Sequence, residues 1–350
     1  MSDADDDAVH ERVRQALRQI LSAQALRIEL LPAGLGLRRF ARVWLAGGPA
    51  ATLVARVEAL EDPAGRPGGS APEPPLEPIR ALLERAGLPV PRSFGADDGV
   101  LLLEDVGDRS LASAAPELGP AERFALYREA CALVPRLQRI ADPGGSAAFS
   151  RRLDAAQITY KGQLFALHSL ARRGRSATPG ELACVRDAFA RIAAEVAAAP
   201  LRLAHRDFQS ANLHLRDAPP GRRLVMIDLQ GAWLAPPEYD LACLLRDSYV
   251  ELPEAEIAAH LEATLSSLPD RPDAATAAQR FDLLTLARKA KDHARFLDVA
   301  RRRGDRRGLA FLPTTLRHLR AAARAAAVRD AAFRDLAELL LALPETPCAP

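Results

Sequence analysis

The hydrophobic pattern of this 350-residue chain changes at about residue 110, and this change limits the possible folds more than any other feature. Short apolar and β-branched runs at residues 40–45, 52–57 and 100–104 indicate strands. From about residue 110 the apolar spacing becomes the three-and-four repeat of helices, interrupted only by a strand-like run at 224–228. A small β-rich part followed by a larger helical part predicts an α+β fold with two lobes.

The expected lobes are an N-terminal lobe of residues 1–105 and a helical lobe of residues 106–350, with a cleft between them. Within the first lobe, residues 61–78 are so rich in Pro and Gly that they predict a surface loop. The expected helices are 8–26, 76–86, 120–141, 153–173, 179–198, 239–248, 254–266, 274–303 and 313–343.

The composition excludes several classes of protein. Lys and Arg total 47 against 45 Asp and Glu, and this near balance argues against a dedicated nucleic-acid binder. An acidic N-terminus without an 18-residue apolar run anywhere predicts no leader and no membrane span, hence a cytoplasmic protein. The four Cys stand far apart, which favours reduced thiols over zinc or disulfides.

The clearest motif is HRDFQSAN at residues 205–212, which fits the pattern H-R-D-x-x-x-x-N at every fixed position. Phosphoryl transfer needs a carboxylate that orients the acceptor hydroxyl and accepts its proton, and Asp207 has that place in the pattern. It also needs an amide oxygen nearby that holds Mg²⁺, which Asn212 supplies. The alternative is that these polar residues only cap and pair in a loop before a helix.

A second carboxylate follows in a strand context. Asp228 stands sixteen residues after Asn212, at the end of the strand-like run and before Leu229-Gln230-Gly231. A carboxylate that projects from a strand end into a cleft is placed to bridge a metal to the β- and γ-phosphates of a nucleotide. This second match makes the phosphoryl-transfer interpretation the favoured one.

With these motifs the chain resembles the aminoglycoside phosphotransferase and choline kinase group of small-molecule kinases, which have the protein-kinase-like fold. The resemblance implies ATP and Mg²⁺, with Asp207 as the catalytic base and His205 shaping its loop. It also implies that Asn212 and Asp228 are the metal ligands. The segment YDLA at 239–242 resembles the one whose Asp supports the loop, and it follows too soon for the long activation segment of a protein kinase.

The first lobe holds the expected nucleotide contacts. Gly34 and Gly36 precede the strand at 40–45 and could let backbone N–H groups approach the phosphates, although a plain turn is an equal alternative. The resemblance also implies that the backbone of Glu104 and Val106 hydrogen-bonds the adenine edge.

One position departs from the kinase pattern, because Arg56 stands where a Lys is expected. Arg keeps the positive charge and adds a bidentate fork for phosphate. Glu77, which opens the following helix, is its expected partner; a solvated residue at a helix start is the alternative.

A narrower resemblance concerns the acceptor, and it implies a sugar-like small molecule phosphorylated at its anomeric hydroxyl. Four segments are similar to the anomeric amino-sugar kinases, which act on C1 of N-acetylmuramate or N-acetylglucosamine: 205–212, 227–230, 239–249 and 295–313. The chain departs from that branch at Gln209, Ala211 and Gly231, where the branch has His, Arg and Asp. An acceptor of the aminoglycoside or choline type therefore stays open. No membrane, nucleic-acid or obligate protein partner is expected.

Residues 288–329 contain 13 Lys or Arg and three Asp. A basic lining would suit an acidic acceptor, but a solvated helix face is the favoured interpretation. Lys161 and His168 could face the cleft but are expected to be ordinary surface or core residues. His214, two residues after Asn212, could contact the metal loop, but no second His or Cys supports a transition-metal site. Two further functions remain alternatives: a nucleotide-binding pseudokinase, suggested by Arg56, and nucleic-acid binding through the basic stretch.

Overall fold

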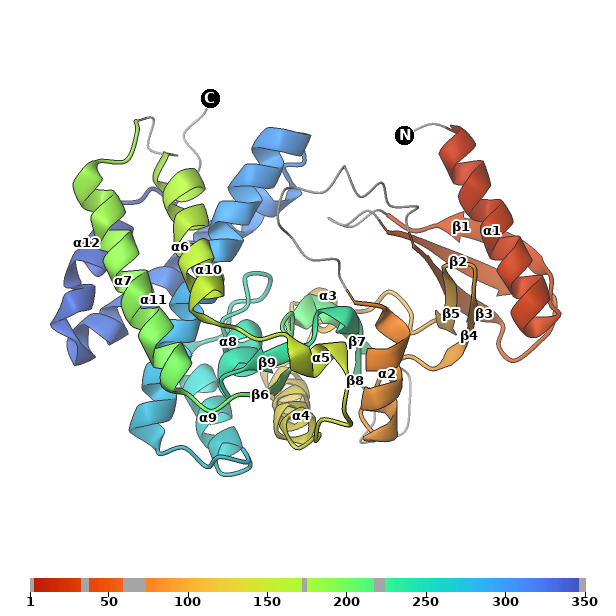
Figure 1. Ribbon diagram of the computed structural model, residues 1–350, viewed down its shortest axis with the longest axis horizontal. Coiled ribbons are helices and arrows are strands. Elements are labelled where there is room, and N and C mark those ends of the chain that lie inside the picture. The colour runs from red at the N-terminus through yellow and green to blue at the C-terminus, as the bar shows by residue number, and fades with distance from the viewer. Residues whose placement is uncertain (1–2, 33–37, 59–73, 172–174, 217–223, 346–350) are drawn as a thin grey trace. The chain divides into compact units, whose positions relative to one another are not determined.

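The structure is a computed structural model that describes residues 3–32, 38–58, 74–171, 175–216 and 224–345 (Figure 1). It divides into two compact units, which are residues 1–108 with 214–230, and residues 109–213 with 231–350. The first change from one unit to the other, after residue 108, lies close to the expected lobe boundary after residue 105. The segment 214–230, expected in the helical lobe, clusters with the first unit.

The first unit is built on a five-stranded antiparallel sheet with the strand order β1-β2-β3-β5-β4. Helix α1 lies along this sheet (Figure 1). The elements are α1 (Asp3–Leu21), β1 (Ala25–Leu30), β2 (Arg39–Leu45), β3 (Thr52–Val57), α2 (Leu76–Arg85), β4 (Ser93–Asp97), β5 (Val100–Glu104) and β8 (Leu224–Met226). Strand β8 pairs with β7 (Leu213–Leu215) in a short two-stranded sheet.

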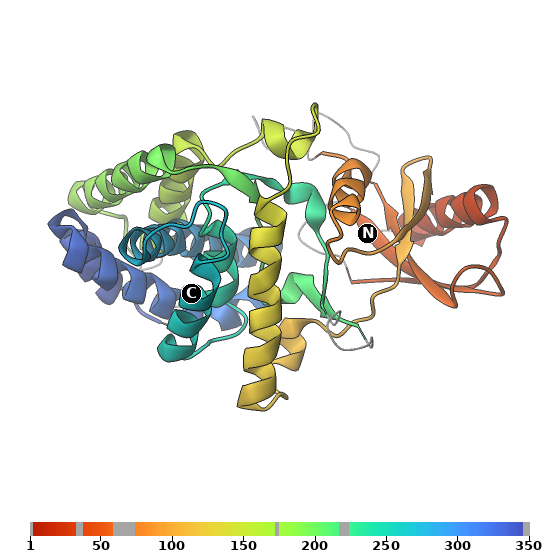
Figure 2. The ribbon, with the colours of Figure 1, turned by 90° about the horizontal axis from the view of Figure 1, so that it is seen from below.

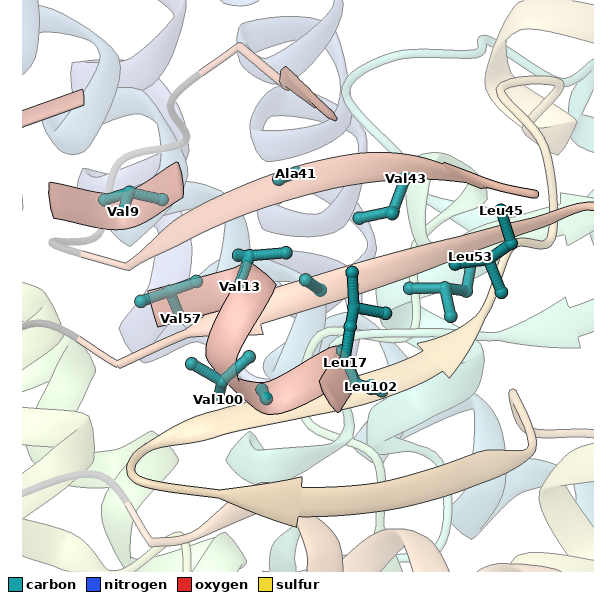
Figure 3. Close-up of a cluster of buried hydrophobic side chains, with 12 residues drawn as sticks. Val9, Val13, Leu17, Ala41, Val43, Leu45, Leu53, Val57, Val100 and Leu102 are labelled. Carbon is teal, nitrogen blue, oxygen red and sulfur yellow. The ribbon is translucent and has the colours of Figure 1, made fainter. Parts of the chain in front are cut away.

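The core of this unit forms between α1 and the three central strands. The apolar residues of α1 recur at the spacing of one helix face, so that this face is buried against the strands. Figure 3 shows the cluster: Val9, Val13, Ala16, Leu17, Ala41, Val43, Leu45, Leu53, Ala55, Val57, Val100 and Leu102.

Two strands of the sheet are not apparent in the sequence pattern. The helix expected to reach residue 26 ends at Leu21, because Ser22 adopts a left-handed φ of 50°, and strand β1 then begins at Ala25. Strand β4 has no fully buried face, so its side chains show no clear alternation. Both strands are at the edges of the sheet, where the burial that creates a period-two pattern is weakest.

The second unit is almost wholly helical and is organised around the 30-residue helix α10 (Ala274–Arg303), which packs against α6, α8 and α11. The long helix α4 is the yellow helix of Figure 2. The other helices are α3 (Leu111–Ala114), α4 (Pro120–Gln138), α5 (Ala147–Ser150), α6 (Ala155–Phe165), α7 (Pro179–Ala198), α8 (Tyr239–Leu245), α9 (Glu254–Leu265), α11 (Leu312–Arg329) and α12 (Arg334–Leu341).

Local signals set the helix ends in this unit. Asp273 caps the N-terminus of α10 by accepting a hydrogen bond from Thr276 N, and Gly304 ends the helix with a φ of 68°. The single helix expected at 313–343 is two helices, because Asp330 leaves the helical conformation and caps a short turn through Ala332 N. None of the helices in the described ranges is long and apolar enough to cross a membrane.

Strands β6 (Arg202–Ala204) and β9 (Trp233–Ala235) form a second short antiparallel pair in this unit. The motif residues 205–212 follow β6 directly, so the pair fixes where the motif loop begins. A β-sheet unit and a mostly helical unit together confirm the predicted α+β class.

Candidate active site

The motif loop is anchored by the first turn of α8. The carboxylate of Asp240, which is buried, accepts hydrogen bonds from His205 N at 2.7 Å and from Arg206 N at 3.1 Å. Arg206 has a left-handed φ of 79°, which is unfavourable for a residue with a side chain. The two bonds hold this bend in place, and the expected supporting role of Asp240 is confirmed. Burial raises the pKa of Asp240 to about 6, although His205 and the two N–H groups oppose the rise.

Asp207 and Asn212 are joined through the backbone of the loop. The Nδ2 group of Asn212 donates to the carbonyl oxygen of Asp207 at 2.8 Å, and Gln209 N donates to the same oxygen at 2.9 Å. Because Nδ2 makes this bond, the Oδ1 atom of Asn212 remains as an oxygen donor of the kind that Mg²⁺ prefers. The side chain of Asp207 is 29% exposed, so a small molecule can reach its carboxylate.

The carboxylate of Asp207 is paired with Arg288 of α10. Arg288 Nη1 donates to Asp207 Oδ1 at 2.7 Å, and the arginine side chain is only 4% exposed. Burial by itself would raise the pKa of Asp207, but the charges of Arg288, Lys291 and Arg206 outweigh burial and hold that pKa well below its usual value. Asp207 is therefore ionised at neutral pH and ready to accept a hydrogen bond from an alcohol.

A second buried carboxylate holds the middle of the loop. Asp247, which is fully buried, accepts hydrogen bonds from Ser210 N at 2.8 Å and from the Ser210 hydroxyl. Its backbone oxygen faces His318 Nε2 at 3.1 Å. Burial lowers the pKa of His318 to about 3, so the ring is neutral. The loop is therefore fixed at its start and at its middle by residues from other elements.

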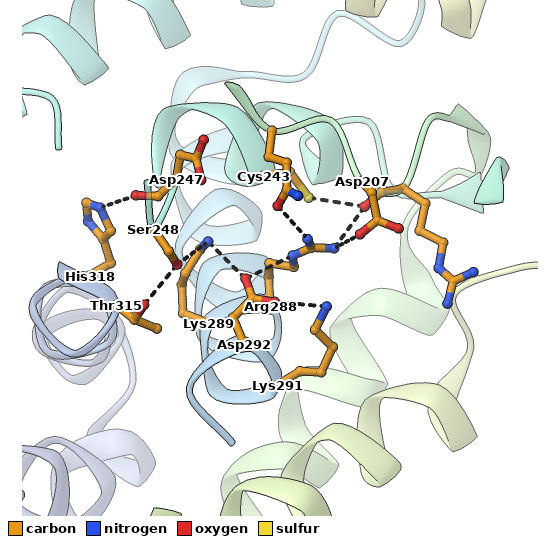
Figure 4. Close-up of polar contacts among 12 residues, drawn as sticks. Asp207, Cys243, Asp247, Ser248, Arg288, Lys289, Lys291, Asp292, Thr315 and His318 are labelled. Atoms are coloured by element: carbon orange, nitrogen blue, oxygen red, sulfur yellow. Dashed lines mark hydrogen bonds and ion pairs between the residues drawn. The ribbon is translucent and has the colours of Figure 1, made fainter. Parts of the chain in front are cut away.

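Part of the basic stretch at 288–329 is buried beside the loop, which corrects the expectation of a solvated helix face. Arg288 and Lys289 are 3% and 1% exposed. Arg288, Lys289 and Lys291 all pair with Asp292, at 3.1, 3.0 and 2.8 Å (Figure 4). The exposed part begins with Arg295, where the solvated-face interpretation fits.

Sequence reasoning did not identify Arg288 or Asp247 as site residues. The available signal was local: three cations within four positions of an otherwise apolar helix segment, and an Asp just after the YDLA segment. Charged residues at helix positions that are otherwise apolar indicate a buried network rather than solvent exposure.

His205 lies inside the loop and not on its surface. The residue is 1% exposed, and its ring meets that of Phe208 edge-on with centroids 5.7 Å apart. This position fits a residue that shapes the loop rather than one that touches an acceptor.

Arg56 lies in β3 of the first unit and is 3% exposed. Its Nη1 atom pairs with Glu58, whereas its buried Nη2 atom has no hydrogen-bond partner among the described residues. Burial lowers the pKa of Arg56, and the charges of Glu58 and Asp228 oppose this effect. A buried guanidinium group with an unused donor is suited to an anionic ligand such as a phosphate.

The expected pairing of Arg56 with Glu77 is wrong. Glu77 instead binds Arg80 of the same helix, through two bonds of 2.7 and 2.8 Å to the guanidinium group. The two residues are three positions apart on α2, and this local pair outcompetes a partner on another element. The partner of Arg56 is Glu58, which stands two residues later in the sequence.

Asp228 also belongs to the first unit. It follows β8 with a left-handed φ of 62°, and Gln230 Nε2 donates to its Oδ1 atom. Asn212, the other expected metal ligand, belongs to the second unit, so a metal site that the two residues share is a proposal.

The remaining nucleotide residues lie on and after β5 or outside the described ranges. Glu104 ends β5, where its N–H group donates to Arg92 O and its carboxylate accepts from Arg92 N and pairs with Arg216. Val106 follows in a partly buried connection. Gly34 and Gly36 fall outside the residues that the structure describes.

The donors fit a magnesium ion by their chemistry. Within the described residues no group of three or more His, Cys, Asp or Glu side chains could hold a metal. Magnesium in nucleotide sites needs only one or two protein oxygens, because phosphate oxygens and water complete its shell. The carboxylate of Asp228 and the amide oxygen of Asn212 are both oxygen donors of this kind.

Lys161, His168 and His214 each lie close to a polar group of the protein. Lys161 is buried, with Nζ 3.4 Å from the Tyr239 hydroxyl, and burial lowers its pKa to about 7. His168 is 3.6 Å from Asp298. His214 Nδ1 is 2.8 Å from Gly107 O.

Comparison with known proteins gives a family and a fold. The model of the phosphotransferase enzyme family matches residues 27–277. The chain is 29% identical over 282 residues to an N-acetylmuramate/N-acetylglucosamine kinase of Pseudomonas aeruginosa, covering 77% of this chain and 78% of that protein. It is 27% identical over 181 residues to the protein of the same name from Neisseria meningitidis, covering 51% and 52% of the two chains.

Solved structures share the fold at low identity. An ADP-bound aminoglycoside phosphotransferase has a TM-score of 0.54 at 16% identity, covering 90% of this chain and 97% of that one. A choline kinase from Streptococcus pneumoniae has a TM-score of 0.57 at 14% identity, covering 92% and 99%. The expected protein-kinase-like fold is thereby confirmed.

Proposed function

This chain belongs to the phosphotransferase enzyme family, and we propose that it transfers the γ-phosphoryl group of ATP to a hydroxyl group of an amino sugar. The amino-sugar class follows from the two relatives named as N-acetylmuramate/N-acetylglucosamine kinases. The finer proposal is that the hydroxyl group is the anomeric one. The observation that carries the chemistry is an ionised, accessible Asp207 on a loop that three buried side chains hold in place.

In this proposal Asp207 is the catalytic base. It accepts a hydrogen bond from the acceptor hydroxyl and takes its proton as the hydroxyl oxygen forms a bond to the γ-phosphorus. The bond from this phosphorus to the β–γ bridging oxygen breaks, and ADP leaves with the electron pair. His205 keeps the shape of the loop from its buried position.

The nucleotide residues have distinct proposed roles. The unused donor of Arg56 binds a phosphate oxygen, and the backbone of Gly34 and Gly36 approaches the same group. The backbone of Glu104 and Val106 binds the adenine edge.

Asn212 and Asp228 are proposed to hold Mg²⁺, which neutralises charge on the phosphates. Their side chains supply an amide oxygen and a carboxylate, the hard donors that this ion prefers. The local Glu77–Arg80 pair leaves Glu77 without the role first expected for it.

The test is the release of ADP with a panel of acceptors, namely N-acetylmuramate, N-acetylglucosamine, a neutral hexose, choline and an aminoglycoside. We expect turnover with one or both amino sugars. In the presence of that acceptor, Asp207→Asn should lower kcat by about 10²- to 10⁴-fold and leave ADP affinity unchanged, because the proposed partner of Asp207 is the acceptor hydroxyl and not the nucleotide.

The panel also separates the competing functions. Transfer of the phosphoryl group to the C1 hydroxyl removes the reducing end of the sugar, and loss of the reducing end would support the anomeric hydroxyl as the acceptor. A product that is still a reducing sugar would contradict it. Tight ADP binding without turnover of any acceptor would favour the pseudokinase alternative that Arg56 suggests.

A further inference from the structure

The guanidinium group of Arg288 organises the acceptor side of the motif loop. Its Nη1 atom donates to Arg206 O at 3.0 Å and to Asp207 Oδ1 at 2.7 Å. Its Nη2 atom donates to Gln209 Oε1 at 3.2 Å, and its Nε atom donates to Asp292 at 3.1 Å. Each nitrogen thus has a partner, and the planar group cannot rotate without breaking several bonds (Figure 4).

The second oxygen of Asp207 lies in a different environment. Among the described residues Oδ2 receives no hydrogen bond, and it faces the backbone of Gly231. A Cβ atom at Gly231 would lie 3.6 Å from Oδ2, and its other neighbours would be the side-chain atoms of Arg206 at 3.5 and 3.8 Å. Because Gly231 has no side chain, the space beside Oδ2 stays open.

We propose that Arg288 is the positioning residue of the transfer, which binds Oδ1 of Asp207 so that Oδ2, on the Gly231 side, accepts the proton of the acceptor hydroxyl. This inference rests on the proposed function and adds to it the direction of approach. The proton of the acceptor hydroxyl moves to Oδ2, the hydroxyl oxygen forms a bond to the γ-phosphorus, and the bond from this phosphorus to the β–γ bridging oxygen breaks. After ADP leaves with the electron pair, Oδ2 gives the proton to water.

The geometry explains why the pairing helps the reaction. A carboxylate that can rotate freely offers either oxygen, whereas a carboxylate fixed at Oδ1 offers one oxygen in one direction. The pairing also lowers the basicity of Asp207, so the contribution of Arg288 is orientation and not a stronger base. Gln209 is held by the same guanidinium group, which places one of the positions that differs from the amino-sugar kinases beside the reacting carboxylate.

The test compares variants of Arg288 with a matched variant on the same helix. Arg288→Gln removes the charge and the planar guanidinium group, and Arg288→Lys keeps the charge but has one donor nitrogen in place of three. Arg280→Gln is the control, because Arg280 is also on α10 and pairs with a buried carboxylate, Glu238, at 2.9 and 2.7 Å, but does not contact Asp207. The measurements are kcat, KM for acceptor and for ATP, and the thermal midpoint.

We expect Arg288→Gln to lower kcat by about 10²-fold with the KM for ATP unchanged, since misplacing a reacting group by about 1 Å costs that much. Arg288→Lys should recover part of the loss. Arg280→Gln should lower the thermal midpoint while leaving kcat within about threefold of the wild type, because it breaks no bond to the loop.

A further variant tests the open side of Asp207. Gly231→Ala adds a methyl group at ordinary contact distances, so the chain should fold. We expect this variant to raise the KM for the acceptor or lower kcat by about tenfold, and to leave ADP affinity unchanged.

The outcomes separate the two proposals. An active wild type whose Arg288→Gln variant keeps full kcat, or loses activity only in step with its thermal midpoint as Arg280→Gln does, overturns the positioning role. Full activity of Gly231→Ala overturns the proposed direction of approach. A wild type that turns over no acceptor contradicts the proposed function, and this inference falls with it.

Discussion

The substitution Asp240→Asn tests whether the anchor of the motif loop acts on catalysis rather than on stability. Asp240 is buried and accepts two backbone N–H groups, from His205 at 2.7 Å and Arg206 at 3.1 Å. Asparagine keeps one acceptor oxygen but turns an NH₂ group toward the other donor. The loop then loses one of two bonds that hold Arg206 at its left-handed φ of 79°.

The stability change follows from two opposing effects. The rise of the Asp240 pKa from 3.8 to about 6 corresponds to about 3 kcal/mol against the ionised carboxylate, which asparagine relieves. The unsatisfied N–H group costs about 1–3 kcal/mol. We therefore expect a change in the free energy of unfolding within about 2 kcal/mol at pH 7, while kcat falls by about 10²-fold because the loop shifts.

The assays are denaturant unfolding and the kinetic measurement with the acceptor found in the panel. The matched control is Asp282→Asn. Asp282 is another buried aspartate of the same unit, and it accepts a hydrogen bond of 2.6 Å from Arg329, which is not a residue of the loop. It should change stability without changing kcat. Wild-type turnover by Asp240→Asn would refute the reasoning.

The same residue predicts a pH dependence. Because its folded-state pKa of about 6 exceeds the ordinary value of 3.8, the contribution of this group to stability is fully present below pH 3.8 and is lost as the pH rises through about 6. Protonation nevertheless removes an acceptor from the loop, so kcat should fall below about pH 6 although this group then stabilises the fold. A kcat that stays constant from pH 8 to pH 5 would contradict this assignment.

Three further predictions concern other parts of the chain. Arg56→Met should raise the KM for ATP by about 10- to 100-fold, as expected for a lost charge-assisted bond to phosphate, with the acceptor KM unchanged; an unchanged KM for ATP argues against the phosphate role. Asp228→Asn should raise the Mg²⁺ concentration for half-maximal activity by about tenfold or more, and an unchanged Mg²⁺ titration would exclude the residue as a ligand. Asp330→Ala should lower the free energy of unfolding by about 1 kcal/mol in a denaturant titration and leave kcat unchanged, since it removes a helix cap and an exposed ion pair with Arg191; no loss of stability would show the cap to be unimportant.

Much of the fold could be predicted because it depends on local patterns. Helix α10 and strands β3 and β5 have the bounds that their periodicity and capping residues indicate. The edge strands β1 and β4 were missed, because a strand that buries little of either face shows no alternation. The helix break at Asp330 was missed because the apolar spacing continues across it.

The candidate site also combines features that depend on local sequence with features that do not. The spacing of Asp207 and Asn212 is a property of one short loop, so the sequence alone specifies that the two residues are joined. The supporting Asp240 was also recognised, because its neighbours form a motif of their own. The partner of Arg56 was assigned wrongly, because Glu58, which directly follows the same strand, is nearer and competes for it.

The sequence by itself determined the change from a β-rich part to a helical part, the family pattern and which carboxylate is proposed as the base. Only the tertiary structure decided that Arg288, 81 residues from Asp207, binds it. Charge along a sequence does not reveal burial, and α10 brings its cations to the loop only because its apolar positions pack into the unit around it. That packing converts a basic stretch that looks solvated into the group that orients Asp207.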